Sequence, residues 1–149
     1  MAATGPGTAD ALVKLFPWGW PGMKKKILYI EDNEQNLYLV TFILEKHGYE
    51  VCAARDGQEG IDSAAVVKPD LILLDIQLPL MDGYAVARQL RTNPDLADIP
   101  IVAVTSYAMA GDRDKALGAG CSGYIEKPIN PASFASKIEE YLEQNKGMG

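Results

Sequence analysis

Short apolar runs alternate with longer amphipathic segments along most of the chain, from residue 26 to residue 145. The apolar runs predict strands at 26–31, 49–54, 71–75, 99–106 and 122–127. Between and after them, apolar residues spaced three and four apart predict helices. These helices are expected between Asn33 and Gly48 and at 57–67, 84–92, about 110–119 and about 132–145. Five strand–helix units in succession predict an α/β fold, in which right-handed crossovers place helices on both faces of a parallel sheet.

The first helix and the third strand carry the clearest local signals. Asn33 is expected to cap the helix and Gly48 to end it. Its buried stripe is predicted at Leu37, Val40, Thr41 and Leu44. The third strand, LILLD, is apolar on both faces, which is typical of a central parallel strand covered by helices on each side.

The third strand ends in a charge, at Asp75. A buried carboxylate is costly unless another group pairs with it. Because the carboxyl ends of parallel strands line one edge of a sheet, the polar residues that end the other strands should lie near Asp75. These residues are Glu31, Asp32, Thr105, Ser106 and Lys127.

The groups expected at this edge suit a metal ion and a phosphoryl group. Clustered carboxylates repel one another without a cation, and Mg²⁺ takes oxygen ligands while retaining several waters. Lys127 offers a positive charge to phosphoryl oxygens, and Thr105 offers a hydroxyl donor. Asp75 would be the nucleophile, because a carboxylate oxygen can attack phosphorus and form an acyl phosphate.

Composition narrows the class of protein. The 149 residues suit one domain, and 48% of them are hydrophobic, enough for a packed core. The net charge of −6 argues against nucleic-acid binding. No apolar run approaches the roughly 20 residues of a membrane span. Cys52 and Cys121 lie far apart without a CxxC pattern, so we expect reduced thiols in a cytoplasmic protein.

The first 22 residues differ from the rest of the chain. They contain both tryptophans, three prolines and four glycines, and the segment MKKKILYIEDN that follows reads like a second beginning at Met23. We therefore divide the chain into a leader, tag or linker remnant at 1–22, a domain at 23–146 and a tail at 147–149. The leader is expected to be dispensable for the chemistry of the domain.

Four segments, YIEDN, LILLDIQLPLMDG, VAVTS and GYIEKP, resemble the receiver domain of bacterial two-component response regulators. The resemblance spans about residues 25–144. It implies a doubly wound, flavodoxin-like fold with five parallel strands in the order 2-1-3-4-5. It also implies a phosphorylation-dependent signalling switch, whose only catalysis is its own phosphorylation and dephosphorylation.

The resemblance implies roles for individual residues. For phosphoryl transfer, the resemblance implies that Asp75 is the acceptor and Lys127 the phosphate-binding lysine. It implies that the Thr105 hydroxyl moves toward the phosphoryl group. Those implied to hold Mg²⁺ are Glu31, Asp32, Asp75 and the backbone carbonyl of Gln77. Thr105 and Tyr124 would form the switch, and the Lys127–Pro128 bond would be cis. Gln77 and Tyr107 occupy positions that vary among receivers, where the side chains tune the access of water to the phosphoryl group.

The implied partners are proteins. A histidine kinase or histidine phosphotransfer protein would supply the phosphoryl group. A downstream target would bind the face formed by the fourth predicted helix, the fifth strand and the last helix. No DNA-binding or enzyme domain follows that helix, so we expect a stand-alone receiver, similar to the DivK and chemotaxis kinds. The alternative is a receiver excised from a hybrid histidine kinase.

Two other classes remain as alternatives. A phosphatase of the haloacid-dehalogenase type also uses an aspartate nucleophile at a strand end with Mg²⁺, but it needs a second aspartate two residues on as general acid. Gln77 stands at that place. A flavodoxin-like or nucleotide-binding module would carry a glycine-rich loop after its first strand, where this chain has EDNEQN.

Overall fold

The computed structural model describes residues 24–106 and 111–147, and its core is one parallel sheet. The strands are β1 (Lys26–Ile30), β2 (Glu50–Ala54), β3 (Leu71–Asp75), β4 (Ile101–Thr105) and β5 (Gly123–Glu126). They lie in the order β2-β1-β3-β4-β5, and each neighbouring pair is parallel. The predicted fold class and strand order are therefore confirmed. The leader 1–22 and Tyr107, both singled out by the sequence, lie outside the described residues.

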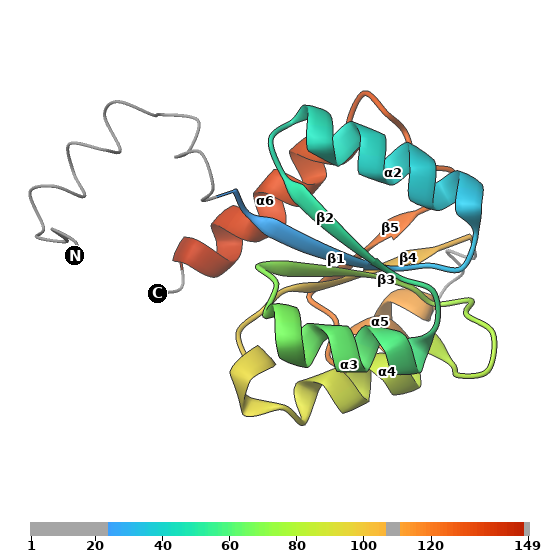
Figure 1. The fold of residues 1–149 in the computed structure, drawn as a ribbon. Coiled ribbons are helices and arrows are strands. Elements are labelled where there is room, and N and C mark those ends of the chain that lie inside the picture. Colours follow the sequence, from blue (N-terminus) through green and yellow to red (C-terminus); the bar gives the residue numbers. More distant parts are fainter. Residues whose placement is uncertain (1–23, 107–110, 148–149) are drawn as a thin grey trace, which may run out of the picture.

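Helices cover both faces of this sheet. They are α2 (Glu34–Lys46), α3 (Gly57–Val67), α4 (Gly83–Arg91), α5 (Asp112–Gly118) and α6 (Phe134–Gly147), with a short 3₁₀ turn, η1 (Pro94–Leu96). Figure 1 shows α2 and α6 on one face and α3, α4 and α5 on the other. None of the described helices is long and apolar enough to cross a membrane.

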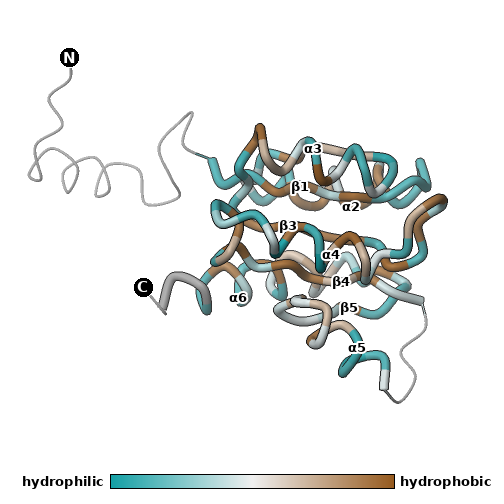
Figure 2. The backbone as a smooth tube through the Cα atoms, turned by 90° about the horizontal axis from the view of Figure 1, so that it is seen from below, coloured by the Kyte–Doolittle hydropathy of each residue, from teal (hydrophilic) through white to brown (hydrophobic). Residues whose placement is uncertain are grey.

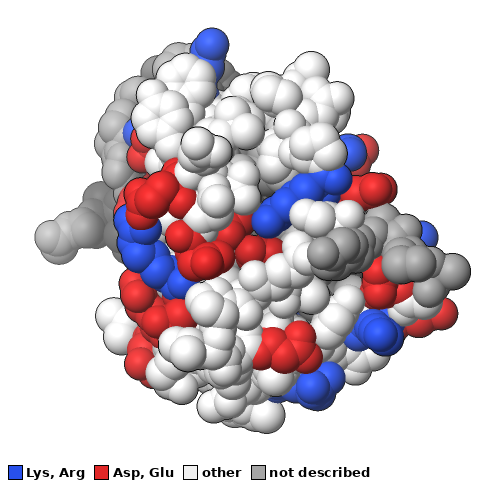
Figure 3. Space-filling model, turned by 90° about the vertical axis from the view of Figure 1, so that its right-hand side faces the viewer, with Lys and Arg blue, Asp and Glu red and all other residues white. Residues whose placement is uncertain are grey.

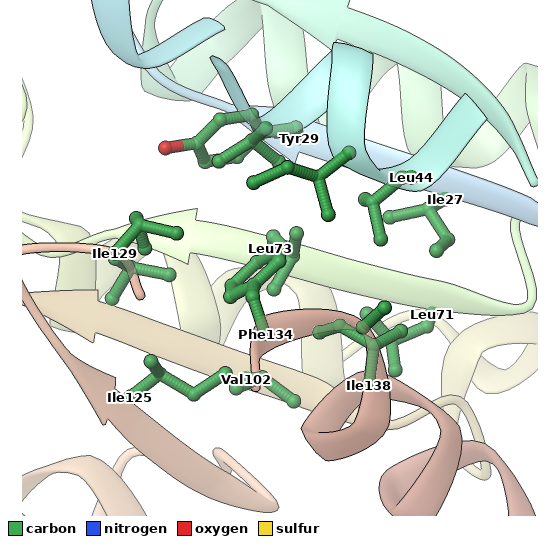
Figure 4. Close-up of a cluster of buried hydrophobic side chains, with 14 of the residues drawn as sticks. Ile27, Tyr29, Leu44, Leu71, Leu73, Val102, Ile125, Ile129, Phe134 and Ile138 are labelled. Atoms are coloured by element: carbon green, nitrogen blue, oxygen red, sulfur yellow. The ribbon is translucent and has the colours of Figure 1, made fainter. Parts of the chain in front are cut away.

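The alternating side chains of the strands build two hydrophobic cores, one on each face of the sheet. On the α2–α6 face, Ile27 and Tyr29 pack with residues such as Phe134, and Figure 4 shows this cluster. On the other face, Leu28 and Ile30 pack against α3, α4 and α5. All five residues of β3 and of β4 are buried, as the apolar pattern of the third strand predicted. Figure 2 shows the hydrophobic backbone segments running through the middle of the domain.

The start of α2 follows the prediction, whereas its buried stripe differs from it. The Asn33 side chain accepts a hydrogen bond from the Asn36 N–H at 2.9 Å, so Asn33 is the N-cap. The stripe contains Ile43, whereas Thr41 is only half-buried. The reason is tertiary, because α6 packs beside α2 and its residues share one core cluster with Ile43.

Other predicted boundaries shift by one or two residues. The last helix begins at Phe134 instead of 132, because Asn130 holds the preceding residues in a turn. Its side chain accepts a hydrogen bond from the Ala132 N–H at 2.9 Å, and its carbonyl accepts one from the Phe134 N–H at 3.0 Å. The third predicted helix begins at Gly83, where the Asp82 side chain accepts from the Tyr84 N–H. These shifts leave the strand ends at the predicted edge of the sheet.

Candidate functional site

The carboxyl ends of four strands meet at one edge of the sheet and carry the polar residues named above. Glu31 follows β1, Asp75 ends β3, Thr105 ends β4 and Lys127 follows β5. Parallel pairing keeps these ends level, with Asp75 opposite Val104 and Thr105 opposite Glu126. The charged or polar residues buried in the described part of the chain are Glu31, Asp75 and Thr105. Figure 3 looks onto this edge and shows acidic side chains gathered near its centre.

Three carboxylates form the centre of the site. Glu31, Asp32 and Asp75 each place one carboxylate oxygen within 4.8 Å of the others. Glu31 and Asp75 are only 1% and 2% exposed, whereas Asp32 faces solvent. Oxygen ligands from carboxylates are the donor set that Mg²⁺ prefers, so the described residues fit a hard divalent cation.

Donors from three neighbouring residues hold the Glu31 carboxylate in place. Its Oε1 accepts hydrogen bonds from the Tyr29 hydroxyl at 3.0 Å and from the Asn36 side-chain amide at 3.2 Å. Its Oε2 accepts one from the Asn33 N–H at 3.2 Å. These contacts leave Glu31 less free to move than the exposed Asp32.

Lys127 brings a positive charge to the same carboxylates. Its ammonium nitrogen lies 3.2 Å from Glu31 Oε1 and 3.4 Å from Asp75 Oδ1. Only 15% of its side chain is exposed. A partly buried ammonium between two buried carboxylates offsets part of their repulsion. The predicted cis bond between Lys127 and Pro128 is confirmed.

Burial and mutual repulsion set the protonation of the two buried acids. Burial, followed by the hydrogen bond with Glu31 and the charge of Glu31, raises the pKa of Asp75 to about 6, although the Gln77 N–H and Lys127 oppose this rise. Burial also acts to raise the pKa of Glu31, but hydrogen bonds from Asp75, Asn33 and Tyr29 and the charge of Lys127 hold it below its usual value. Burial and the nearby Glu31 raise the pKa of Tyr29, which therefore stays a donor. The site holds an excess of negative charge that favours a bound cation.

The remaining predicted site residues lie around this centre. The backbone N–H of Gln77 donates to Asp75 Oδ1 at 3.0 Å, and its side-chain oxygen accepts from the Ser106 N–H at 3.4 Å. Thr105 is 4% exposed. Tyr124 is half-buried on β5, where it packs against the core cluster shared with α5. Tyr124 lies opposite Ala103, two residues before β5 ends at Glu126.

Two residues that contact the site were missed in the sequence. Tyr29 and Asn36 both donate to Glu31, and neither was assigned to the site. Tyr29 lies two positions before Glu31, so strand periodicity places both side chains on the same side of the sheet. That spacing was an available signal. Asn36 lies in the first turn of α2, where its direction depends on how the helix packs on the sheet.

Comparison with known proteins gives the family. The chain matches the Response regulator receiver domain family over residues 27–139 and belongs to it. It is 42% identical over 120 residues to the polar-differentiation response regulator DivK of Brucella anthropi, covering 80% of this chain and 98% of DivK. A DivK of Brucella ovis matches at the same identity and coverage.

Solved structures support the same assignment. A CheY-like receiver domain protein from Methanospirillum hungatei superposes with a TM-score of 0.78 at 32% identity, covering 85% of this chain and 99% of that one. The receiver domain of the sensor histidine kinase PA1611 from Pseudomonas aeruginosa superposes with a TM-score of 0.75 at 33% identity, covering 80% and 98%. That structure has a magnesium ion coordinated in its active-site cleft.

Family membership decides between the classes left open by the sequence. The chain is a receiver domain, a phosphorylation switch of two-component signalling rather than a catalytic enzyme. A receiver domain implies a histidine kinase as partner. The phosphatase and nucleotide-binding alternatives are therefore set aside. Its acidic cluster is typical of the receiver magnesium site.

Proposed function

We propose that Asp75 accepts a phosphoryl group from a phosphohistidine and that the chain signals through protein contacts that depend on this modification. The observation that carries the proposal is the cluster of Glu31, Asp32 and Asp75 facing the Lys127 ammonium at one strand edge. A nucleophile, a cation site and a phosphate-binding charge are the three components that phosphoryl transfer to a carboxylate requires.

Mg²⁺ is the proposed cofactor. Glu31, Asp32, Asp75 and the backbone carbonyl of Gln77 are the residues that would hold it. The three carboxylate oxygens within 4.8 Å of one another support this ligand set. When bound, the ion supplies positive charge beside the transferring phosphoryl oxygens.

The chain's own groups perform the transfer. An oxygen of Asp75 attacks phosphorus, a P–O bond forms, and the P–N bond to the donor histidine breaks. Asp75 attacks only when ionised, and a pKa of about 6 leaves most of it ionised at neutral pH. Lys127, already 3.4 Å from Asp75 Oδ1, is placed to donate to a phosphoryl oxygen with a small displacement. The Thr105 hydroxyl is proposed to donate to a second one.

Output is proposed to run through Thr105 and Tyr124 to the face formed by α5, β5 and α6. Phosphorylation changes the charge on Asp75 from about one negative to about two and adds acceptor oxygens. This charge would draw Thr105 inward and allow Tyr124 to repack, a shift between two packings. A hollow of about 240 Å³ on this face supports the proposal, because it gives a side chain room to move. It is lined by Arg113, Leu117, Ser122, Gly123, Tyr124, Tyr141 and Gln144.

The setting of the domain belongs to the same proposal. The division into 1–22, 23–146 and 147–149 stands as proposed, as does a cytoplasmic location, which the free thiols of Cys52 and Cys121 support. The match to DivK, which covers 98% of that response regulator, supports a stand-alone receiver. The match to the receiver domain of the sensor histidine kinase PA1611 supports a receiver from a hybrid kinase. A histidine kinase or histidine phosphotransfer protein is the proposed donor in either case.

The direct test is chemical. Incubation with acetyl phosphate and Mg²⁺ is expected to add one phosphoryl group, visible by intact mass, and peptide mapping should place it on Asp75. Asp75→Asn should abolish the addition, chelation of Mg²⁺ should prevent it, and Asp95→Asn, an exposed acid on η1, should leave it unchanged. A normal yield in Asp75→Asn would refute the assignment.

A further inference from the structure

The Tyr29 side chain places a hydroxyl group at the boundary between an apolar core and the acidic site. Its ring is fully buried and packs in the core cluster on the α2–α6 face. Figure 4 shows the ring among apolar side chains, with the hydroxyl pointing in the direction in which the strands run. The hydroxyl donates to Glu31 Oε1 at 3.0 Å. A phenylalanine would fill the same core space, so the hydroxyl is explained by the carboxylate that it contacts.

Glu31 Oε1 has more donors around it than one carboxylate oxygen needs. Besides the Tyr29 hydroxyl, the Asn36 side-chain amide lies 3.2 Å from it, and the Lys127 ammonium also lies 3.2 Å from it. A carboxylate has about four acceptor sites on its two oxygens, so each oxygen is satisfied by roughly two donors. One of the three donors is therefore available to another acceptor without leaving Oε1 unsatisfied.

Lys127 is the donor that has a second acceptor, because its ammonium also lies 3.4 Å from Asp75 Oδ1. A phosphoryl group on Asp75 would bring new charged oxygens to this ammonium. If Lys127 moves toward them, the Glu31 carboxylate loses its positive partner. Glu31 is only 1% exposed, so solvent offers little replacement. Such a loss is costly for a buried carboxylate unless other hydrogen bonds hold it.

The Tyr29 hydroxyl is the better fixed of the two donors that remain. Tyr29 lies on β1, two residues before Glu31, and its ring is held by core packing. Asn36 is only half-buried in the first turn of α2. A donor that is already in place costs no reorganisation at the moment of reaction.

We propose that Tyr29 is a positioning residue for phosphoryl transfer, whose hydroxyl holds Glu31 in place while Lys127 moves to the phosphoryl group on Asp75. This inference rests on the proposed function of Asp75 and on Mg²⁺ as the proposed cofactor. Glu31 is one of the residues that would hold the ion, so a fixed Glu31 also favours cation binding. Removal of a group that orients a metal ligand typically lowers metal affinity or activity by roughly ten- to a hundred-fold.

The test removes the hydroxyl and keeps the ring, with Tyr29→Phe. Tyr49→Phe is the matched control, because Tyr49 packs against the same core cluster but directly precedes β2, at the end of the sheet opposite the acids. Tyr29→Phe is also made in a Glu31→Ala background, which removes the acceptor. Mg²⁺ binding is measured by calorimetry. Labelling by acetyl phosphate is measured at Mg²⁺ concentrations that saturate each variant, and thermal unfolding verifies that each variant is folded at the assay temperature.

Tyr29→Phe should bind Mg²⁺ about ten-fold more weakly than the wild type and should be labelled about ten-fold more slowly at saturating Mg²⁺. Tyr49→Phe should match the wild type in both measurements. In the Glu31→Ala background, Tyr29→Phe should change neither quantity by more than about two-fold, because two residues that act through one contact are not additive.

Four results would overturn the inference. The first is an unchanged labelling rate in Tyr29→Phe. The second is weaker Mg²⁺ binding with a normal rate at saturation, because Lys127 would then move as freely without the hydroxyl. The third is an equal loss in Tyr49→Phe, which would indicate a general effect on the core. The fourth is a full ten-fold loss in the Glu31→Ala background, which would mean that the hydroxyl acts through another group. Failure of acetyl phosphate to label the wild-type chain is a different outcome, because it would refute the proposed acceptor.

Discussion

Replacing Asp75 with asparagine should stabilise the metal-free protein at neutral and alkaline pH. The Asp75 carboxylate is buried beside Glu31, and burial together with Glu31 opposes its ionisation. An asparagine side chain is neutral at every pH and has nearly the same shape. Its amide is able to donate to Glu31 as a protonated Asp75 does. The substitution therefore mimics the protonated form of the acceptor.

The size of the effect follows from the pKa of Asp75, which rises from its ordinary value of 3.8 to about 6. A raised pKa means that the folded state binds the proton more tightly than the unfolded chain. Compared with a fold in which Asp75 stayed ionised, the proton on Asp75 stabilises the folded state in full below the pKa of the unfolded chain. This stabilisation is lost as the pH rises through about 6. Roughly two pH units correspond to about 3 kcal/mol. Above pH 7, the free energy of unfolding of Asp75→Asn should therefore exceed that of the wild type by up to about 3 kcal/mol.

The assay is urea unfolding in the presence of EDTA, at several pH values between 4 and 8. The gap between the variant and the wild type should be largest at pH 8 and close to zero at pH 4. Glu31 is present in both proteins, so its titration contributes to both curves. Asp95→Asn serves as the control, because it removes an exposed carboxylate far from the site. Millimolar Mg²⁺ should then narrow the gap at pH 8 by stabilising the wild type.

Two outcomes would refute this reasoning. If Asp75→Asn is no more stable than the wild type at pH 8 without metal, the buried carboxylates do not repel as their geometry indicates. If the gap is the same at pH 4 and pH 8, the gain does not come from ionisation of Asp75.

Three further predictions concern the metal, the switch and the leader. Asp32→Asn should weaken Mg²⁺ binding, measured by calorimetry, more than Glu31→Gln, because the exposed Asp32 is freer to bind the ion directly; the reverse order would reject this ligand assignment. Thr105→Ala should still be labelled but respond poorly in partner binding, and Tyr124→Ala should change partner affinity with little loss of labelling; wild-type responses in both would exclude this switch. Deletion of residues 1–22 should leave labelling by acetyl phosphate intact, and loss of labelling would show that the leader contributes.

Much of the fold was predictable because it depends on local patterns. The period of apolar residues distinguishes strands from helices, and the doubly apolar third strand identifies the centre of the sheet. Parallel strands bring their carboxyl ends to one edge, so Asp75 and Lys127 could be placed together without coordinates. The donors that hold Glu31, Tyr29 and Asn36, were missed, because the direction of the Asn36 side chain in the first turn of α2 depends on how that helix packs on the sheet.

Several features depended only on the tertiary structure. The Arg91 side chain donates to the carbonyls of Leu96, Ile99 and Gly120, which ties α4 to the segment that follows it and to the distant turn at Gly120, and no pattern around Arg91 indicates this role. The burial of Ile43 in place of Thr41 required the position of α6. The sequence by itself determined the elements, their order and the acids at the strand ends, since periodicity and charge are local properties. Packing decided the partners of Glu31 and the rise in the pKa of Asp75, because burial arises only when distant segments meet.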